Sequence, residues 1–402
     1  MVTADIPRTA LCLAAVVVTA RVLGAAATRL RQPAVAGEIV AGVLLGPSIL
    51  GWVTPMPGTD LAGKIAAGLF LFVAGMEIDL STIARERRTA LAVGLCGLVF
   101  PFALGFAAGW FAPGALEIGA AGDRASGATF FGIALSISAL PVIARTLMNL
   151  GLYRTPFGMT VIAAAVIDDV VGWVLFALLV ARLAGADHAG PGPYWTIPLV
   201  PVLAVVMLTV VRRGADRALP GLTRGVGAAG VAGLAVLLAL AGGLSAHWIG
   251  VHAMFGAFLA GIALGDSEHL PARARSILGG AVEWVFAPLF FGSIGLVVDF
   301  ARDFDAALCA VVLVLACAAK LLGCSIGARI AGMPARRAWA LGFAMNSRGA
   351  MGIVLGLLAF DAGLIGARML VALVLMALVT SLAAGPAITR LLRPDREGAE
   401  QV

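Results

Sequence analysis

The chain has 402 residues, of which 61% are hydrophobic and only 12% are charged. A soluble domain carries roughly 25% charged residues, and apolar runs of about 20 residues, long enough to cross a bilayer, recur along the whole chain. This composition excludes a soluble globular protein. The net charge of +6 does not indicate a nucleic-acid-binding protein, because the basic residues are spread over short connections and do not gather on one face.

Charged and Gly/Pro-rich breaks predict thirteen membrane helices, which lie in chain order at 9–28, 34–50, 62–80, 90–111, 127–148, 158–181, 195–213, 225–243, 249–265, 278–298, 306–328, 338–360 and 367–389. The sequence therefore predicts an all-α polytopic membrane protein, with residues 1–402 forming one membrane transporter domain. The first apolar run could instead be a cleaved signal peptide, since Arg8 precedes it and small residues follow. Arg21 interrupts the run, and we interpret it as a retained spanning helix.

The basic residues of the connections are divided unequally between two sides. The odd-numbered connections and the C-terminal tail carry 18 Lys and Arg residues, including Arg31, Arg85 and Arg154, whereas the N-terminus and the even connections carry 6. Cytoplasmic connections carry the excess of basic residues. The sequence thus predicts a multi-pass protein of the inner (plasma) membrane, with its N-terminus outside and its C-terminus in the cytoplasm.

Two motifs recur at nearly one offset. The segment 41–46 (AGVLLG) recurs as 260–265 (AGIALG), an offset of 219, and Leu69-Phe70-Leu71-Phe72…Gly75…Asp79 recurs as Leu289-Phe290-Phe291…Gly295…Asp299, an offset of 220. The offset relates predicted helices that are seven apart, an odd number, so the two halves run in opposite directions. We therefore expect inverted repeats over about 34–182 and 249–390, an organisation typical of secondary transporters whose binding site lies near the bilayer midplane.

Two adjacent carboxylates, Asp168 and Asp169, lie at the centre of the predicted helix 158–181. A charge at that depth costs roughly 2.5–3.5 kcal/mol, so it must face the protein interior or a water-filled cavity. A structural alternative is a buried ion pair that holds two helices together. One ion pair requires only one carboxylate, however, and the sequence has two. Neighbouring helical residues point about 100° apart. One aspartate can therefore face a permanent partner while the other holds a proton or a cation by turns.

Lys320 is the predicted ion-pair partner and a candidate proton carrier. It is one of two lysines in a chain with 26 arginines, and it lies near the centre of the predicted helix 306–328. A buried lysine can lose its proton, whereas an arginine cannot. This property suits a group that must release a carboxylate when a cation arrives.

Two predicted helices, one in each repeat, are interrupted at their centres by polar or helix-breaking residues: Ser136, Ser138 and Pro141 in the first, and Asn346, Ser347 and Arg348 in the second. Corresponding interruptions in the two halves indicate a binding site, although a plain packing kink is the alternative for Pro141. Since Arg348 keeps its charge, we expect it to compensate the C-terminal dipoles of half-helices and to orient the carboxylates.

The sequence gives no indication of an enzyme, a cofactor or a resident metal. Its five cysteines all lie in apolar stretches without the paired spacing of a metal site, and we interpret them as small buried hydrophobic residues.

The segment 37–48 (GEIVAGVLLGPS), the pair Asp168-Asp169 and the segment 320–323 (KLLG) together resemble the monovalent cation:proton antiporter-2 family, which has the Nha-type fold. The resemblance covers essentially the whole membrane region. It implies that Asp169 is the cation and proton ligand, that Asp168 pairs with Lys320, and that the two interrupted helices are the polar crossing helices. It also implies a homodimer in which a mobile core subdomain works against a dimerisation subdomain.

Two features depart from the family pattern. Members of the potassium-efflux type carry a cytosolic nucleotide-binding domain after the membrane region, whereas this chain stops about a dozen residues after its last predicted helix. We therefore expect no C-terminal regulatory domain. Those members also commonly lack a paired Asp-Asp, so its presence here favours the electrogenic branch.

The expected function is secondary active antiport of a monovalent cation, Na⁺ before K⁺ or Li⁺, against protons. The acid pair and the lysine favour an exchange of two protons for one cation. A sodium-coupled symporter of an organic anion on a similar fold is the alternative within transport. An ion channel and a membrane sensor are the alternatives from other classes.

Overall fold

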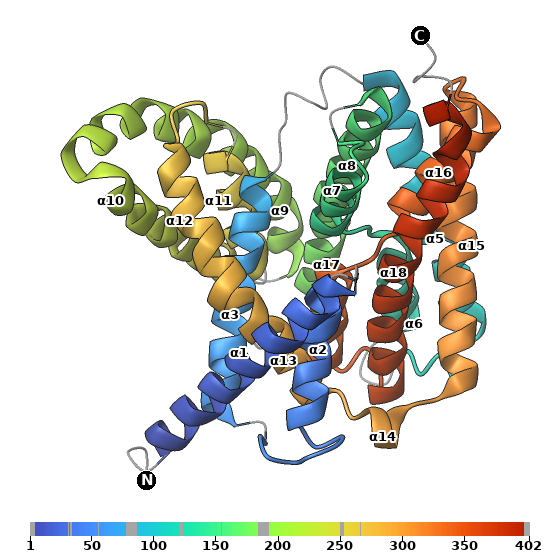
Figure 1. Cartoon of the computed structure of the whole chain (residues 1–402), viewed down its shortest axis with the longest axis horizontal. Coiled ribbons are helices and arrows are strands. Elements are labelled where there is room, and N and C mark those ends of the chain that lie inside the picture. Colours follow the sequence, from blue (N-terminus) through green and yellow to red (C-terminus); the bar gives the residue numbers. More distant parts are fainter. Residues whose placement is uncertain are drawn as a thin grey trace. The chain divides into compact units, whose positions relative to one another are not determined.

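The computed structural model describes ten stretches of the chain: residues 5–30, 32, 34–54, 56–77, 87–119, 124–153, 155–183, 193–249, 253–265 and 267–397 (Figure 1). Asp79 of the repeated motif and the loop residues Arg31, Arg85 and Arg154 lie outside the described residues, as does the side chain of Pro141.

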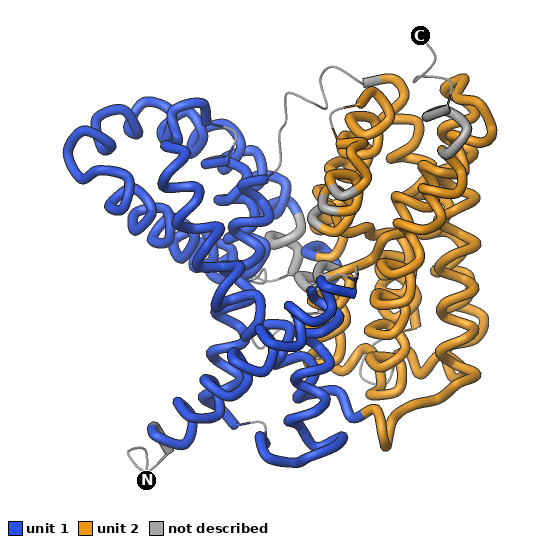
Figure 2. Tube along the Cα trace, in the orientation of Figure 1, with its two compact units in different colours: residues 1–80, 177–299 blue, residues 81–176, 300–402 orange. Residues whose placement is uncertain are grey.

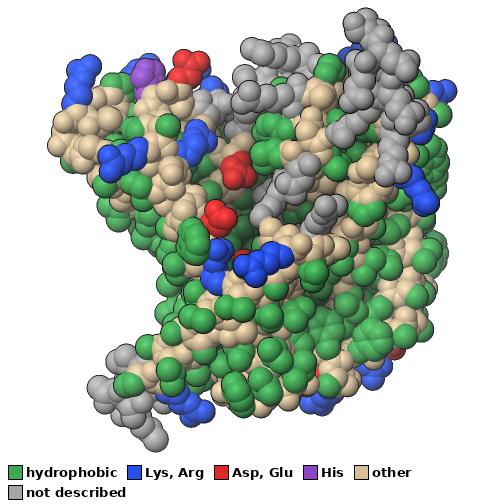
Figure 3. Space-filling model, in the orientation of Figure 1, with side chains coloured by type: hydrophobic (Ala, Val, Ile, Leu, Met, Phe, Trp, Pro, Cys, Tyr) green, Lys and Arg blue, Asp and Glu red, His purple; other side chains and the backbone are tan. Residues whose placement is uncertain are grey.

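The described residues are almost entirely helical, which confirms the predicted fold class. Within the described residues, eight helices are long and apolar enough to cross a membrane, and three shorter helices are also apolar. Large hydrophobic side chains such as Leu11, Val210 and Ile330 are 72%, 63% and 70% exposed, and hydrophobic side chains cover much of the lower part of the face drawn in Figure 3. A surface of this kind is stable in lipid, where helices satisfy their own backbone groups.

The chain forms two compact units, each built from two separate stretches of sequence (Figure 2). Unit 1 comprises residues 1–80 and 177–299. Its helices are α1 (Asp5–Arg29), α2 (Ala34–Leu45), α3 (Pro57–Met76), α9 (Pro193–Val206), the π-helix η1 (Met207–Val211), α10 (Arg212–Trp248), α11 (Ala253–Gly265), α12 (Ala272–Ala281), the π-helix η2 (Val282–Phe286) and α13 (Ala287–Val297).

Two helix contacts of unit 1 are related by the offset of its sequence motifs. α2 packs against α13, and α3 packs against α11. A Cβ on Gly295 would lie 2.3 Å from the Ile39 carbonyl oxygen, and a Cβ on Gly75 would lie 2.4 Å from the Phe258 carbonyl oxygen. Gly75 precedes Gly295 by 220 residues and Ile39 precedes Phe258 by 219. Glycine is required at both contacts because any side chain would enter the facing backbone.

One predicted boundary in unit 1 differs from the structure. The segment 214–224, expected to be a charged loop between two helices, is helical and belongs to α10. Its arginine, alanine and leucine residues favour a helix, and charged residues at a membrane surface do not require a loop. The backbone instead breaks at Gly227, whose φ of 68° is readily adopted only by glycine.

Unit 2 comprises residues 81–176 and 300–402. Its helices are α5 (Arg87–Phe111), α6 (Arg124–Ser136), α7 (Leu140–Asn149), α8 (Pro156–Leu183, up to Phe176), the short α14 (Phe300–Asp303), α15 (Ala306–Ile330), α16 (Ala335–Met345), α17 (Ala350–Asp361) and α18 (Ala367–Glu397). α5 packs against α6 and α15, and α18 packs against α15, α16 and α17.

Both interruptions predicted in unit 2 are full breaks. The first crossing helix is divided into α6 and α7 by residues 137–139, and the second into α16 and α17 by residues 346–349. Pro141 lies in the first turn of α7, where its missing N–H costs no helical hydrogen bond. It therefore begins a new half-helix and is more than a packing kink. The two breaks meet, because the Ala139 amide donates to the Ser347 carbonyl at 2.9 Å.

Candidate functional site

The two aspartates lie in α8 within unit 2, and both have no exposed surface. The residues before them on the helix, 161–166, are also buried. A carboxylate in such surroundings needs a proton, a cation or hydrogen-bond donors to offset the loss of water. The two side chains meet this need in different ways.

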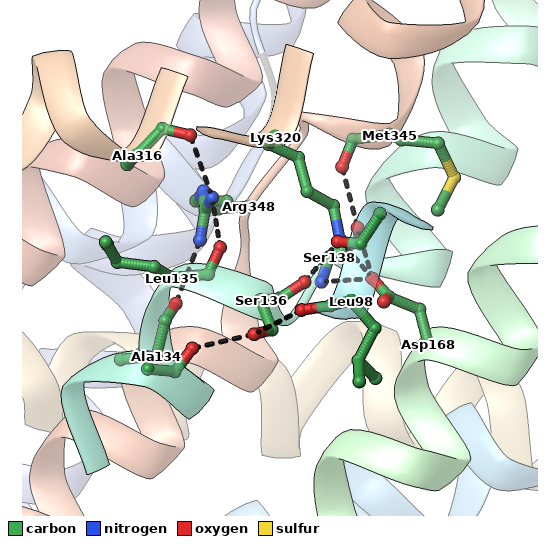
Figure 4. A network of polar contacts seen from close by, with 12 residues as sticks. Leu98, Ala134, Leu135, Ser136, Ser138, Asp168, Ala316, Lys320, Met345 and Arg348 are labelled. Atoms are coloured by element: carbon green, nitrogen blue, oxygen red, sulfur yellow. Dashed lines mark hydrogen bonds and ion pairs between the residues drawn. The ribbon is translucent and has the colours of Figure 1, made fainter. Parts of the chain in front are cut away.

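Asp168 is held through one of its oxygens. Lys320 of α15 forms an ion pair with Oδ2 at 2.5 Å, and the Ser138 amide and hydroxyl lie 3.1 Å and 2.7 Å from the same atom (Figure 4). The Ser138 hydroxyl also lies 2.6 Å from the Met345 carbonyl. Since a hydroxyl carries one hydrogen, it donates to one of these acceptors at a time. The other Asp168 oxygen, Oδ1, has no hydrogen-bond partner among the described residues.

Lys320 uses all three of its N–H groups. Besides Asp168, its ammonium donates to the Gly97 carbonyl of α5 at 2.9 Å and to the Ser136 carbonyl at the end of α6. The side chain is completely buried. The ammonium is therefore fixed between three helices and is fully satisfied only while it carries its proton.

Asp169 has no comparable support. Neither of its oxygens has a hydrogen-bond partner within the described parts of the chain. The Leu140 amide, in the first turn of α7, interacts with this carboxylate but does not reach hydrogen-bond geometry. Of the two aspartates, Asp169 is thus the one with both oxygens available to bind a proton or a cation.

The end of α6 shows why two cations lie near the carboxylates. A helix end leaves its last four carbonyls without intrahelical partners. Here each of the four accepts a hydrogen bond. The Ile133 carbonyl accepts from the Ile137 amide at 3.2 Å, and the Ser136 carbonyl accepts from Lys320. The Ala134 and Leu135 carbonyls between them accept from the Arg348 guanidinium, at 2.8 Å and 2.5 Å. Arg348 also donates to the Ala316 carbonyl of α15 at 3.2 Å. The guanidinium therefore contacts the negative end of a half-helix (Figure 4).

The remaining polar residues of the two breaks have different surroundings. The Ser136 hydroxyl turns to backbone carbonyls, with Gly132 at 2.7 Å and Leu98 at 3.2 Å, so only its carbonyl reaches Lys320. The Asn346 amide nitrogen donates to Cys317 Sγ at 3.3 Å. The Asn346 carbonyl oxygen and the Ser347 hydroxyl are buried without a hydrogen-bond partner in the described structure.

Two further residues of this network were not predicted from the sequence. Thr380 of α18 accepts a hydrogen bond from the Arg348 amide at 3.3 Å, and the Ser381 hydroxyl donates to the Arg348 carbonyl. Hydroxyl side chains are inexpensive in a membrane helix and carry no charge, so composition does not distinguish them. The internal repeat could have indicated these residues, because α18 follows the second broken helix in the chain just as α8, which carries the aspartates, follows the first.

A family model described as "Sodium/hydrogen exchanger, transmembrane" matches residues 14–393. The chain belongs to this family. The resemblance read from the sequence is thereby confirmed, and the sodium/hydrogen exchanger family places the chain among multi-pass membrane transporters rather than enzymes.

The chain is similar to several named exchangers. It is 32% identical to Cation/H(+) antiporter 20 of Arabidopsis thaliana over 95% of this chain and 48% of the plant protein. It is 28% identical to the Na(+)/H(+) antiporter NhaS4 of Synechocystis, with 92% and 94% covered, and 26% identical to the Na(+)/H(+)-K(+) antiporter GerN of Bacillus cereus, with 93% and 94% covered. The chain spans about half the length of the plant relatives it matches.

A solved structure has the same fold. The sodium proton antiporter MjNhaP1 of Methanocaldococcus jannaschii matches with a TM-score of 0.70 over 97% of both chains, at 13% sequence identity. The predicted Nha-type fold is therefore confirmed, although the described helices do not establish the count of thirteen.

Proposed function

We propose that this protein is a secondary active antiporter that exchanges a monovalent cation, Na⁺ in preference to K⁺ or Li⁺, for protons. The observation that carries the proposal is the contrast between Asp168, held by Lys320 and Ser138, and Asp169, whose two buried oxygens have no hydrogen-bond partner in the described chain. The names of the relatives support the same class of transport, and they do not support the sodium-coupled symporter.

Exchange follows from the chemistry of Asp169. A buried carboxylate without partners is stable only when a proton or a cation neutralises it. Both ligands require the same two oxygens, so binding one displaces the other. Alternating access to the two sides of the membrane then converts this competition into antiport.

Neighbouring oxygens could complete a cation site. Na⁺ is a hard cation, for which oxygen atoms are the suitable ligands. Asp168 Oδ1, Asn346 Oδ1 and Ser347 Oγ are buried oxygens without hydrogen-bond partners in the described residues. The Ser347 carbonyl accepts a hydrogen bond from the Ala139 amide. Ala139 precedes Leu140, and the Leu140 amide interacts with Asp169. We infer that these atoms supply additional ligands to a transient cation at Asp169.

The second proton of an electrogenic cycle would come from Lys320. When a cation occupies Asp169, its positive charge repels the ammonium, and the lysine can then release a proton, which arginine cannot do. Asp168 would then remain ionised, with its Oδ2 still accepting from the Ser138 amide and hydroxyl, so that both released protons leave the site. Exchange of two protons for one cation moves one net charge, which draws about 2.3 kcal/mol per 100 mV from the membrane potential.

We also propose the wider organisation that the family resemblance implies. The chain would form a homodimer in the inner membrane, with its N-terminus outside and its C-terminus in the cytoplasm. Unit 2, which contains the site, would be the core subdomain and unit 1 the dimerisation subdomain, each with helices from the repeats 34–182 and 249–390. Cross-linking in the membrane and labelling of single cysteines near each terminus would test these assignments.

The test of function is a pH-gradient dequenching assay in proteoliposomes that contain the purified protein. Addition of Na⁺ should dissipate an imposed pH gradient, with weaker responses to Li⁺ and K⁺, and the Na⁺ response should change when a membrane potential is imposed. A gradient that no monovalent cation dissipates would refute the antiport proposal. An exchange rate that does not change with the membrane potential would refute only the electrogenic form of the proposal.

A further inference from the structure

The helix that follows each broken crossing helix carries an adjacent pair of oxygen-bearing side chains. In the first half the pair is Asp168 and Asp169 on α8, and in the second it is Thr380 and Ser381 on α18. The first member of each pair accepts a hydrogen bond from a backbone amide in its break. The Ser138 amide donates to Asp168 at 3.1 Å, and the Arg348 amide donates to Thr380 at 3.3 Å.

The α18 pair holds the backbone of Arg348 on both sides. Thr380 accepts from its N–H while donating its own hydrogen to the Met376 carbonyl at 2.8 Å, and Ser381 donates to its C=O. A hydroxyl can accept and donate together, so Thr380 is satisfied in both roles. Thr380 is buried and Ser381 is partly buried. The Arg348 peptide is therefore fixed at a point where the chain has left regular helix.

This anchoring determines where the Arg348 side chain can reach. Arg348 is 1% exposed, and its guanidinium donates to Ala134, Leu135 and Ala316. A shift of the Arg348 backbone would therefore withdraw the guanidinium from the end of α6. The adjoining Ser347 carbonyl accepts the Ala139 amide at 2.9 Å. The anchored segment thus borders the start of α7, where the Leu140 amide interacts with Asp169.

We propose that Thr380 and Ser381 are positioning residues of the antiporter, which hold the second broken segment so that the cation site at Asp169 keeps its shape. The inference rests on the proposed function. Hydroxyls suit this role because they bind the backbone without adding another buried charge, which would need its own proton or cation. One half of the molecule then carries the exchanged ion, and the corresponding pair in the other half supports it.

The test is sodium-dependent exchange by Ser381→Ala and Thr380→Val in proteoliposomes. Because each variant removes one hydrogen bond that defines the site, the apparent KM for Na⁺ should rise roughly three- to tenfold, while the maximal rate stays within about twofold. The conservative variants Ser381→Thr and Thr380→Ser keep the hydroxyl and should restore the wild-type KM. Thermal unfolding in detergent, measured on the same samples, separates loss of folded protein from loss of affinity.

Thr389→Val is the matched control on α18. Among the described residues its hydroxyl donates to the Gly385 carbonyl of the preceding turn alone, at 2.9 Å, so its removal should leave the KM for Na⁺ unchanged. An unchanged KM in both Ser381→Ala and Thr380→Val would overturn the positioning role, as would a KM that the hydroxyl-retaining variants fail to restore. Absence of exchange in the wild-type protein would instead refute the proposed function itself.

Discussion

Lys320 and Arg348 share the C-terminal carbonyls of α6, because Arg348 contacts Ala134 and Leu135 while Lys320 contacts Ser136. The C-terminal end of a helix carries a partial negative charge of about half an elementary charge. This helix end is buried, where water does not satisfy its carbonyls. Two cations meet that need, Lys320 from α15 and Arg348 from the second break, and Lys320 also holds Asp168.

Replacement of Arg348 by lysine should destabilise the protein although the charge is kept. The planar guanidinium reaches three carbonyls through two nitrogen atoms. The lysine ammonium has a single nitrogen atom and cannot reach all three carbonyls with the same geometry. At least one buried carbonyl would lose its partner, at a cost of about 1–3 kcal/mol. Thermal unfolding should show a lower Tm for Arg348→Lys, and Arg336→Lys, at an exposed position of α16, serves as the control. Equal melting temperatures for the two variants would contradict this account of α6.

Lys320→Ala should be more damaging than the combined change Lys320→Ala with Asp168→Asn. Removal of the lysine alone leaves a buried carboxylate unpaired, and breaking a buried ion pair in this way costs about 3–5 kcal/mol. The second substitution removes the orphaned charge, although the Gly97 and Ser136 carbonyls still lack a donor. We therefore expect the double variant to regain part of the lost Tm. A double variant no more stable than the single one would show that the ion pair is not the source of the loss.

Lys320→Ala also tests the proton-carrying role. If the lysine releases one of two protons, its loss should make exchange electroneutral, and the response of Na⁺-driven proton flux to an imposed potential should disappear. Flux that remains as voltage-sensitive as in the wild type would assign the second proton to another group.

The sequence predicted the site best where it places charged or polar residues that are costly to bury in a membrane. Charges at Asp168 and Lys320 stand out in apolar helices because each must find a partner, and the structure places their side chains 2.5 Å apart. The polar and proline residues at the centres of two helices likewise predicted both breaks. The choice of which aspartate meets the lysine did not follow from helical geometry, since an angle of about 100° between neighbours fits either assignment; it came from the family resemblance.

Features that cost little in a membrane could not be predicted in the same way. Thr380 and Ser381 hold Arg348 through hydroxyls, and such residues occur in many apolar helices without a special role. The segment 214–224 was expected to be a loop because of its charges, yet it is helical. Charge indicates a boundary of the membrane and does not by itself indicate where a helix ends.

Asp169→Asn should abolish exchange while leaving the protein folded. The asparagine amide cannot bind a proton and a cation in turn, so exchange should stop. The protein should stay folded because the substitution removes a buried carboxylate that has no hydrogen-bond partner among the described residues. A ligand that binds only the folded state raises Tm, so Na⁺ should stabilise the wild type and have no effect on Asp169→Asn. Asp60→Asn is the matched control, because Asp60 is exposed and forms a surface ion pair with Lys64 at 3.0 Å. Wild-type turnover or retained Na⁺ stabilisation in Asp169→Asn would reject Asp169 as the ligand.

The paired glycines of unit 1 give a prediction that is independent of the ion site. Gly75 and Gly295 occupy corresponding positions of the two repeats, and a Cβ would lie 2.4 Å and 2.3 Å from a facing carbonyl oxygen. Gly75→Ala and Gly295→Ala should therefore each destabilise the protein by a similar amount, about 1–3 kcal/mol, as overpacked contacts do.

Gly68, also in α3, is the control for these two substitutions because a Cβ there would meet no atom within 4 Å. Gly68→Ala should leave stability unchanged or raise it by up to about 1 kcal/mol, since alanine restricts the unfolded chain and favours helix. Melting temperatures of the three variants in detergent provide the measurement. If Gly75→Ala lowered Tm and Gly295→Ala did not, the two contacts would not be energetically equivalent, and the twofold relation between α2–α13 and α3–α11 would hold for the backbone alone.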